Sequence, residues 1–239
     1  MKIATAQLTC SPADLPANLK QLGVLADEAR GRGAELVVFP ELALTGYELD
    51  AVLSRRDLWI RPNDARLDAL RAAGIAVVVN CVAVTGEERP AIETLVFGPD
   101  GDLLTTYRKQ HLFEHEQEAF VAGRHDGRFE LGGLRFGLAT CFDNHFSALL
   151  SRVADDRCQV LLASSLYGTS GGVEELARVY PGIAEAFGLH VVLANHVGPA
   201  GAWTGCGRSG LWSPGGGLLV QADAERTMAV LADVEPGAA

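Results

Sequence analysis

The stretch from Leu134 to Ser164, LRFGLATCFDNHFSALLSRVADDRCQVLLAS, predicts a strand, a helix and a second strand in succession. The apolar run over 134–140 stops at Cys141, an amphipathic segment follows over 146–156, and residues 158–164 form another apolar run. Strands that alternate with helices are typical of an α/β fold. The same stretch raises a chemical question, because Cys141 is either a small core residue or a nucleophile at the end of a strand.

The rest of the chain follows a similar pattern. Apolar runs predict strands over 2–8, 35–41, 75–84 and 190–197, and amphipathic spacing predicts helices over 13–33, 65–74 and 173–188. Residues 92–109 predict a hairpin that turns at Pro-Asp-Gly, 50–63 a loop or short helix, and 205–234 a Gly-rich strand-turn-strand ending. Since no linker or repeat divides the chain, we expect one α/β domain over 1–239.

Composition narrows the classes of partner. The chain has 239 residues, 48% of them hydrophobic, and a formal net charge of −10 without a basic run, which argues against nucleic-acid or acidic-membrane binding. No apolar run approaches the roughly 20 residues that span a bilayer, so we expect a cytoplasmic protein that binds a small molecule or another chain. The five cysteines are scattered and odd in number, which predicts free thiols.

Three reactive residue types follow apolar strands: Glu41 after LVVFP, Lys109 after LLTTYR, and Cys141 after RFGLAT. The carboxyl ends of strands are where functional side chains gather in α/β folds. A thiol can attack an acyl carbon, a carboxylate can take the thiol proton, and an ammonium can stabilise the oxyanion. Each residue alone is more often a core thiol or a surface charge, so the set needs further support.

That support comes from a resemblance. FPELALTGYE, YRKQHLF and CFDNHF resemble the three motif blocks of the carbon–nitrogen hydrolase (nitrilase) superfamily, in the same order, with 68 residues from Glu41 to Lys109 and 32 from Lys109 to Cys141. Similar stretches run from IATAQL near the start to GRSGLWSPGGGLL near the end. The resemblance implies a four-layer α-β-β-α sandwich and an enzyme that cleaves C–N bonds through a cysteine thioester, without a cofactor.

The resemblance also implies residue roles. Glu41 would be the general base, Lys109 the oxyanion stabiliser and Cys141 the nucleophile, and the backbone N–H of Phe142 would complete the oxyanion hole. A second glutamate is expected seven residues before a glycine, which favours Glu116, although Glu114 and Glu118 lie close by.

Five further residues are candidates for contact with the substrate. Asp143 and Asn144 either contact substrate or cap the following helix, and capping is the commoner role. His145 and Tyr167 are candidates for substrate contact, and Trp203 is a candidate for the pocket wall, where aromatic residues also serve as core anchors.

The subclass follows from the residues after the nucleophile. Phe142-Asp143 resembles the amidase-type branches rather than the Trp-Glu of nitrilases, which favours a small linear amide or N-carbamoyl substrate and release of ammonia or an amine. A nitrile hydrolase remains an alternative among enzymes. A catalytically silent binding subunit is a second alternative, which the departure of segment 182–188 from the family pattern permits. Phe187 there would favour an apolar acyl group. The resemblance further implies a homodimer or higher homo-oligomer.

Other constellations carry less weight. His111 and His115 are spaced for one edge of a metal site, but no third and fourth ligands with recognisable spacing follow, so we expect no metal. His145 could form a Cys-His pair with Cys141, which would leave the Glu and Lys blocks unexplained. The Gly-rich stretch 198–210 lacks a phosphate-binding pattern, so no nucleotide is expected.

Overall fold

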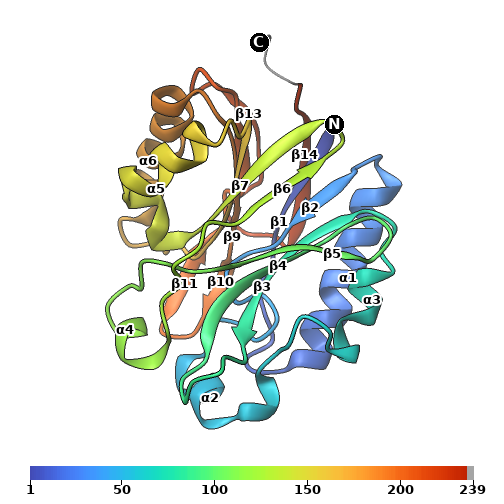
Figure 1. Ribbon diagram of the computed structural model, residues 1–239, viewed down its shortest axis with the longest axis vertical. Helices are drawn as coiled ribbons and strands as arrows, with labels where there is room; N and C mark the ends of the chain where they lie inside the picture. Colours follow the sequence, from blue (N-terminus) through green and yellow to red (C-terminus); the bar gives the residue numbers. More distant parts are fainter. Residues whose placement is uncertain (236–239) are drawn as a thin grey trace.

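Two six-stranded sheets face each other in the computed structural model, which describes residues 1–235, and helices cover their outer faces (Figure 1). The predicted α-β-β-α sandwich is therefore confirmed. Residues 236–239, the end of the expected domain, lie outside the described residues.

The first sheet has the order β14-β1-β2-β3-β4-β5. Strands β1, β2 and β3 are parallel, whereas β3, β4 and β5 form antiparallel pairs, and β14 pairs antiparallel with β1. The strands are β1 (Lys2–Gln7), β2 (Leu36–Val38), β3 (Ala76–Ala83), β4 (Ala91–Phe97), β5 (Leu103–Arg108) and β14 (Met228–Asp233).

The second sheet has the order β13-β12-β9-β8-β7-β6, with β7, β8 and β9 parallel. Its strands are β6 (Arg128–Leu131), β7 (Leu134–Thr140), β8 (Val160–Ser165), β9 (His190–Asn195), β12 (Gly210–Trp212) and β13 (Leu218–Gln221), and a separate ribbon pairs β10 (Val197–Ala200) with β11 (Trp203–Cys206). The α-helices are α1 (Leu15–Gly31), α2 (Leu49–Ser54), α3 (Asp68–Arg71), α4 (Glu116–Ala119), α5 (Ser147–Asp155) and α6 (Gly172–Phe187).

Strand side chains alternate between two apolar cores, and this alternation produces the layers. Val37 and Val77 pack in the core that contains the buried residues of α1, whereas Val38 and Val78, one position along, pack in the core shared with the second sheet and helices α5 and α6. Because successive side chains of a strand point to opposite faces, continuous apolar strands can be covered on both sides. The first sheet is therefore buried between α1 and the second sheet (Figure 1).

Hydrogen bonds cross the interface between the sheets. Thr5 on β1 donates its hydroxyl to the carbonyl of Leu193 on β9 at 2.5 Å, and Ser164 on β8 donates to the carbonyl of Phe39 at 2.8 Å. All four residues are buried. A buried polar group must be paired to avoid a desolvation cost, so these bonds favour one registration of the two sheets.

Several elements differ from the sequence prediction. The helix expected over 65–74 is a 3-10 turn, Ala65–Leu67, followed by the single turn α3, and it ends before Gly74, whose φ is 70°. The predicted strand-turn-strand ending is wrong in its topology, because 205–234 contributes to β11, β12 and β13 and then crosses to the first sheet as β14. A short 3-10 helix, Cys141–His145, also separates β7 from α5.

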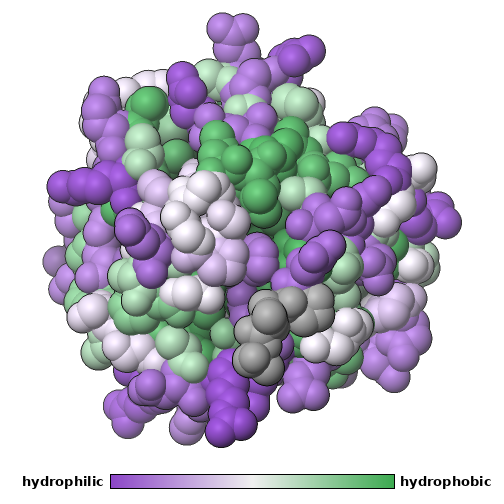
Figure 2. All heavy atoms as spheres, turned by 90° about the horizontal axis from the view of Figure 1, so that it is seen from above, coloured by the Kyte–Doolittle hydropathy of each residue, from purple (hydrophilic) through white to green (hydrophobic). Residues whose placement is uncertain are grey.

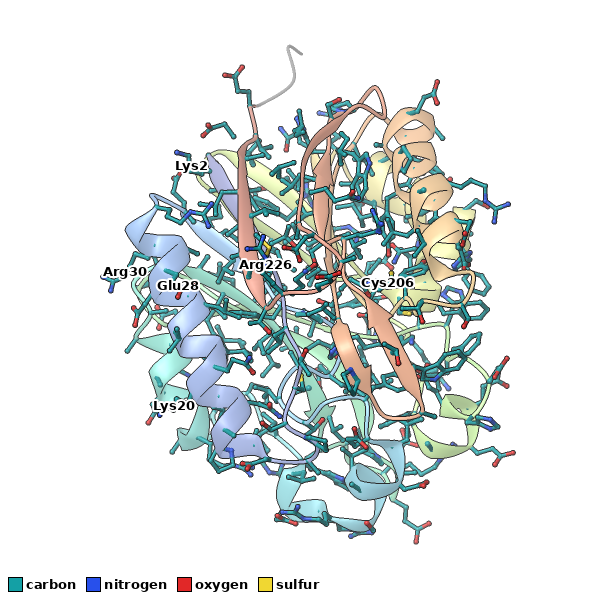
Figure 3. All side chains as sticks on the ribbon, turned by 180° about the vertical axis from the view of Figure 1, so that it is seen from behind. Lys2, Lys20, Glu28, Arg30, Cys206 and Arg226 are labelled. Atoms are coloured by element: carbon teal, nitrogen blue, oxygen red, sulfur yellow. The ribbon has the colours of Figure 1, made fainter. Side chains whose placement is uncertain are left out.

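The outer surface is mixed in character. Lys20, Glu28 and Arg30 lie along the exposed side of α1 (Figure 3), whereas a hydrophobic area bordered by hydrophilic residues is visible from above (Figure 2). Exposed large apolar side chains include Leu218 and Leu219 on the edge strand β13. Assembly into a homo-oligomer stays a prediction. Across residues 1–235, no helix combines the length and apolarity that a membrane crossing requires.

Candidate active site

The two sheets bring three strand ends to one rim of the sandwich. Glu41 follows β2 and Lys109 follows β5 in the first sheet, and Cys141 follows β7 in the second. Glu41 and Cys141 both line a cavity of about 230 Å³, and Lys109 lies buried behind it in contact with Glu41. Residues from distant parts of the chain thus meet only because the sheets pack face to face.

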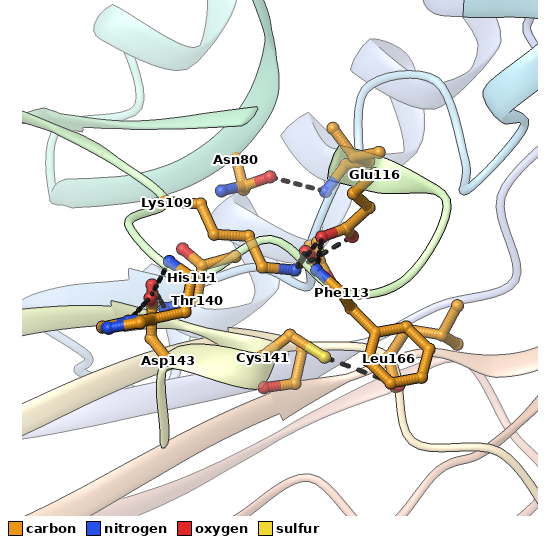
Figure 4. Close-up of polar contacts among 12 residues, drawn as sticks. Asn80, Lys109, His111, Phe113, Glu116, Thr140, Cys141, Asp143 and Leu166 are labelled. Atoms are coloured by element: carbon orange, nitrogen blue, oxygen red, sulfur yellow. Dashed lines mark hydrogen bonds and ion pairs between the residues drawn. The ribbon is translucent and has the colours of Figure 1, made fainter. Parts of the chain in front are cut away.

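Lys109 is the centre of a buried ionic cluster (Figure 4). Its Nζ lies 2.7 Å from Glu41 Oε1 and 2.7 Å from Glu116 Oε2, and the three side chains are essentially inaccessible to solvent. Burial by itself would lower the pKa of Lys109, but the carboxylates of Glu41 and Glu116 outweigh it and raise that pKa above its usual value. The ammonium therefore stays protonated, as a fixed positive charge beside the cavity.

Glu116 is held by donors on both carboxylate oxygens. The Tyr47 hydroxyl donates to Oε1 at 2.5 Å, and the backbone N–H of Phe113 donates to Oε2 at 2.7 Å. Burial and the nearby carboxylates raise the pKa of Tyr47, so it remains a phenol that can donate. Of the three glutamates near this position, the structure brings Glu116 to Lys109, whereas Glu114 and Glu118 are exposed.

Glu41 has a different environment. Its Oε1 accepts from Lys109, but within the described residues its Oε2 has no hydrogen-bond partner. Burial raises the pKa of Glu41 to about 7, against the opposing effect of Lys109 and with a further contribution from Glu116. A carboxyl group with a pKa near neutrality can both accept and return a proton.

His196 supports Glu41 from the second sheet. Its Nε2 lies 2.5 Å from the backbone carbonyl of Glu41, and burial lowers the pKa of His196 to about 4, so the ring is neutral at pH 7. Because a carbonyl oxygen only accepts, Nε2 carries the proton and Nδ1 faces the Cys10 thiol at 3.9 Å. The sequence does not predict a role for His196, since nothing in VVLANHV distinguishes a positioning histidine from a core histidine.

Cys141 occupies a strained turn. Its φ is 48°, in the left-handed region that non-glycine residues rarely adopt, and it is half-buried whereas the other four cysteines are buried. Its Sγ lies 3.8 Å from the carbonyl of Leu166. Burial and the charge of Glu41 raise the thiol pKa and Lys109 lowers it, with a net rise. The resting thiol is therefore protonated and needs a base to become a nucleophile.

Asp143 joins the Cys141 turn to the loop after Lys109. One carboxylate oxygen accepts from Thr140 N at 3.0 Å and from the Tyr107 hydroxyl at 2.7 Å, and the other accepts from His111 N at 2.8 Å. Asp143 closes a capping box with Thr140 at the start of the 3-10 helix. The expected cap of the following helix is wrong, because the N-cap of α5 is Phe146, which makes no side-chain cap hydrogen bond. His111 also contacts Asp143 through its ring and stacks on Phe146. Within residues 1–235, no group of three or more side chains is arranged to hold a metal ion.

Asn144 lies away from the cavity. Its side chain donates to the backbone carbonyl of Cys141 at 2.9 Å and to the Tyr180 hydroxyl at 3.3 Å, and it is absent from the described cavity wall. The structure therefore places Asn144 as a support of the Cys141 turn instead of a substrate contact. Phe187 packs against the second core and is likewise absent from the described lining, so the apolar preference expected from it has no structural basis.

The cavity wall is largely aromatic. It includes the expected Phe142, His145 and Tyr167, together with the candidate Trp203, and sequence analysis missed Phe113, Tyr47 and Glu175. The Nε2 of His145 lies 3.3 Å from the Tyr167 hydroxyl and 3.2 Å from Glu175 Oε1, so His145 is engaged with the wall. Glu175 lies in the first turn of α6, a position that the amphipathic pattern of that helix marks only as a surface acid.

Known proteins resemble the chain over nearly its whole length. The family described as carbon-nitrogen hydrolase matches residues 2–238. A protein named as a hydrolase from Mycobacterium tuberculosis is 32% identical over 234 residues, 92% of this chain and 81% of that protein. An omega-amidase from Bos taurus is 30% identical over 229 residues, 91% of this chain and 83% of that protein.

Solved structures agree with the sequence comparisons. A variant of the amidase from Nesterenkonia sp. AN1 in complex with butyramide has a TM-score of 0.89 and 27% identity, and it covers 98% of this chain and 90% of that chain. Another variant of that amidase shows the result of Michael addition of acrylamide at its active site cysteine, again with a TM-score of 0.89. With its fold, the order of its motif blocks and a family match from residue 2 to residue 238, the chain belongs to the carbon-nitrogen hydrolase family.

Proposed function

We propose that the protein is an amidase that hydrolyses a small linear amide through a thioester on Cys141. One observation carries the proposal: the ammonium of Lys109 lies between two buried carboxylates beside the cavity that the half-buried Cys141 lines. A carboxylate with a pKa near 7, a fixed ammonium and a protonated thiol are the three groups that acyl transfer from an amide requires.

The first half of the reaction forms the acyl-enzyme. Glu41 takes the proton of the Cys141 thiol as Sγ attacks the amide carbon, and the carbonyl oxygen becomes an oxyanion. Lys109 Nζ and the backbone N–H of Phe142 stabilise that oxyanion; the latter belongs to the first turn of the 3-10 helix, where N–H groups have no intrahelical acceptor. Glu41 then returns the proton to the amide nitrogen, the C–N bond breaks, and ammonia leaves.

The second half releases the acid. Glu41 takes a proton from a water molecule that attacks the thioester carbon, and the tetrahedral intermediate collapses with cleavage of the C–S bond. The departing Cys141 sulfur regains its proton from Glu41, so the enzyme returns to its initial state. The net change is one amide and one water converted to one carboxylic acid and ammonia.

Glu116 has a supporting role in this scheme. It contacts Lys109 with both oxygens and is itself fixed by Tyr47 and Phe113. A second carboxylate keeps Lys109 charged after Glu41 has accepted a proton, which is the moment when the oxyanion needs the ammonium. We therefore assign Glu116 as a positioning residue and Glu41 as the base.

Relatives support an amide over a nitrile substrate. Proteins named as omega-amidases and an amidase solved with butyramide cover most of this chain, and Phe142 follows the nucleophile where nitrilases carry Trp. A neutral carboxamide also presents the planar carbonyl oxygen that the oxyanion donors would receive. Nitrile hydrolysis is the second arm of the experiment below.

The test is ammonia release from a panel of short amides, N-carbamoyl amino acids and the corresponding nitriles, with intact mass spectrometry of the protein. We expect release from amides, a mass increase that maps to Cys141 when hydrolysis is interrupted by acid, and loss of both in Cys141→Ala. Cys158→Ala is the matched control, because Cys158 is a buried thiol outside the cavity wall. Ammonia from nitriles alone would refute the amidase assignment, and no release with no adduct would leave the silent-subunit alternative.

A further inference from the structure

The cavity beside Cys141 has an uneven charge distribution. Two acidic side chains, Glu41 and Glu175, line it, and the lining contributed by the described residues includes neither Lys nor Arg. Glu41 is already paired with Lys109, whereas the recorded side-chain partner of Glu175 is the Nε2 of His145 at 3.2 Å. The Glu175 side chain is 40% exposed, so its carboxylate can still meet a ligand.

Aromatic rings surround the same space. Tyr167 is buried, Phe113 and Phe142 are half-buried, and Trp203 is 46% exposed at the wall. The face of an aromatic ring carries negative electrostatic potential and attracts ammonium groups, an effect that increases as water is excluded. A carboxylate within a set of aromatic rings is suited to a positively charged group that has an alkyl stem.

A neighbouring groove also combines acidic and aromatic residues. The groove has a volume of about 740 Å³ and shares Tyr47 and Trp203 with the cavity. Its acidic residues are Glu48, Asp50 and Glu118, and no Lys or Arg belongs to the part of its wall that the structure describes. A surface region of one sign attracts ligands of the opposite sign, so the approach to the cavity favours a cation and disfavours an anion.

We propose that the enzyme selects amides whose acyl chain ends in a positively charged amino group, with Glu175 as the specificity-determining residue. The inference rests on the amidase function proposed above. The carboxamide would lie at Cys141, the alkyl chain along the aromatic wall, and the ammonium against Glu175. A carboxylate at that end of the substrate would face the Glu175 carboxylate, and the described lining has no Lys or Arg to balance the two negative charges. The cavity of about 230 Å³ corresponds to about eight water volumes, which suits a short chain.

The experiment compares substrates of similar size and different charge. Values of kcat/KM are measured by ammonia release for 4-aminobutanamide, for its neutral counterpart pentanamide and for anionic succinamate, and the same series is repeated with one carbon fewer and with one and two carbons more. We expect the amino amide to exceed the neutral amide by about tenfold at the best length, and the anionic amide to be the slowest.

Two variants separate a contact from a general charge effect. Glu175→Gln removes the charge at the wall, and we expect the ratio of kcat/KM between amino and neutral amide to fall by about tenfold. Glu174→Gln is the matched control, because Glu174 is exposed on the same turn of α6 and lies outside the described cavity wall; the ratio should stay within about twofold. Calorimetric binding of 4-aminobutanamide to Cys141→Ala, with and without Glu175→Gln, reports the same contact without turnover.

The possible results distinguish the two proposals. Hydrolysis of neutral or anionic amides at least as fast as amino amides at every length, or a ratio that Glu175→Gln leaves unchanged, overturns the cation preference and leaves the amidase function standing. A ratio lowered equally by Glu174→Gln also overturns the assignment of Glu175, because the effect would then be long-range. No hydrolysis of any amide, with no adduct on Cys141, refutes both.

Discussion

Replacing Glu41 with glutamine should abolish activity and at the same time stabilise the folded protein. The buried cluster contains two carboxylates and one ammonium, and the Oε2 of Glu41 has no partner within residues 1–235. Glutamine keeps the acceptor that faces Lys109 and places an uncharged amide group at the position of Oε2. The remaining Lys109–Glu116 pair is then neutral as a whole, so less charge is held away from water.

The magnitude follows from the pKa of Glu41. The structure raises it from 4.5 to about 7, so the folded state holds its proton at pH values where the unfolded chain has released it. Stability is therefore lost as pH rises from the unfolded pKa to the folded pKa, and above pH 7 the full penalty of about 3 kcal/mol remains. Glu41→Gln does not have this penalty, which is small near pH 5. The difference in free energy of unfolding between the variant and the wild type should therefore grow by about 2–3 kcal/mol between about pH 5 and pH 8, in favour of the variant.

Urea unfolding of both proteins at the two pH values measures this difference. Glu116→Gln is the matched control, since Glu116 accepts hydrogen bonds on both oxygens and an amide nitrogen there would face a donor. We expect that variant to be less stable than the wild type at both pH values, by about 3 kcal/mol. A Glu41→Gln variant that is no more stable at pH 8, or whose advantage is independent of pH, would refute the assignment of a buried carboxyl with a raised pKa.

Three further outcomes are expected. The value of kcat/KM should rise with pH through about 7 as Glu41 ionises, and a flat profile between about pH 5.5 and 8.5 would contradict its role as base. His196→Phe removes the donor to the Glu41 carbonyl. We expect the free energy of unfolding, measured in urea, to fall by about 1–3 kcal/mol and kcat to fall by about tenfold. Unchanged values would exclude a positioning role. Gly123→Ala should lower the thermal midpoint, because an added Cβ would lie 2.1 Å from the Arg108 carbonyl oxygen. Gly182→Ala is the control, because Gly182 lies in exposed space on α6, and its free energy of unfolding should rise by about 0.5–1 kcal/mol. Equal midpoints for the two variants would contradict the close contact at Gly123.

Local patterns predicted the strands that carry the three central residues, because a buried strand is a continuous apolar run and its end is visible in the sequence. Glu41 and Cys141 come directly or almost directly after such a run, whereas Lys109 follows β5, an edge strand that is only partly buried and was predicted as one arm of a hairpin. Their proximity could not be predicted in this way, because nothing in residues 35–41 indicates which strand of the other sheet lies opposite. The resemblance to a family supplied that information, and the fold it implied is the fold observed.

Features that depend on long-range pairing escaped prediction for the same reason. The last strand, β14, pairs with β1 across more than two hundred residues of sequence. The residues of β14 do not themselves indicate which strand they pair with. His196 and Glu175 belong to the site through the docking of β9 and α6, not through a local motif. Glu116 could be chosen over its neighbours only from its spacing to Gly123, a residue packed against Arg108 at the end of β5.

The division of the site between two sheets has a consequence for the chain as it folds. Glu41 and Lys109 belong to the first sheet and Cys141 to the second, and the contacts from Thr5, Ser164 and His196 bring the two together. A chain with one sheet formed would carry a thiol without its base, or a base without its thiol. Catalytic competence would then arise in a single step with the docking of the sheets, which makes turnover a direct reporter of the final stage of folding and leaves partly folded chains chemically inert.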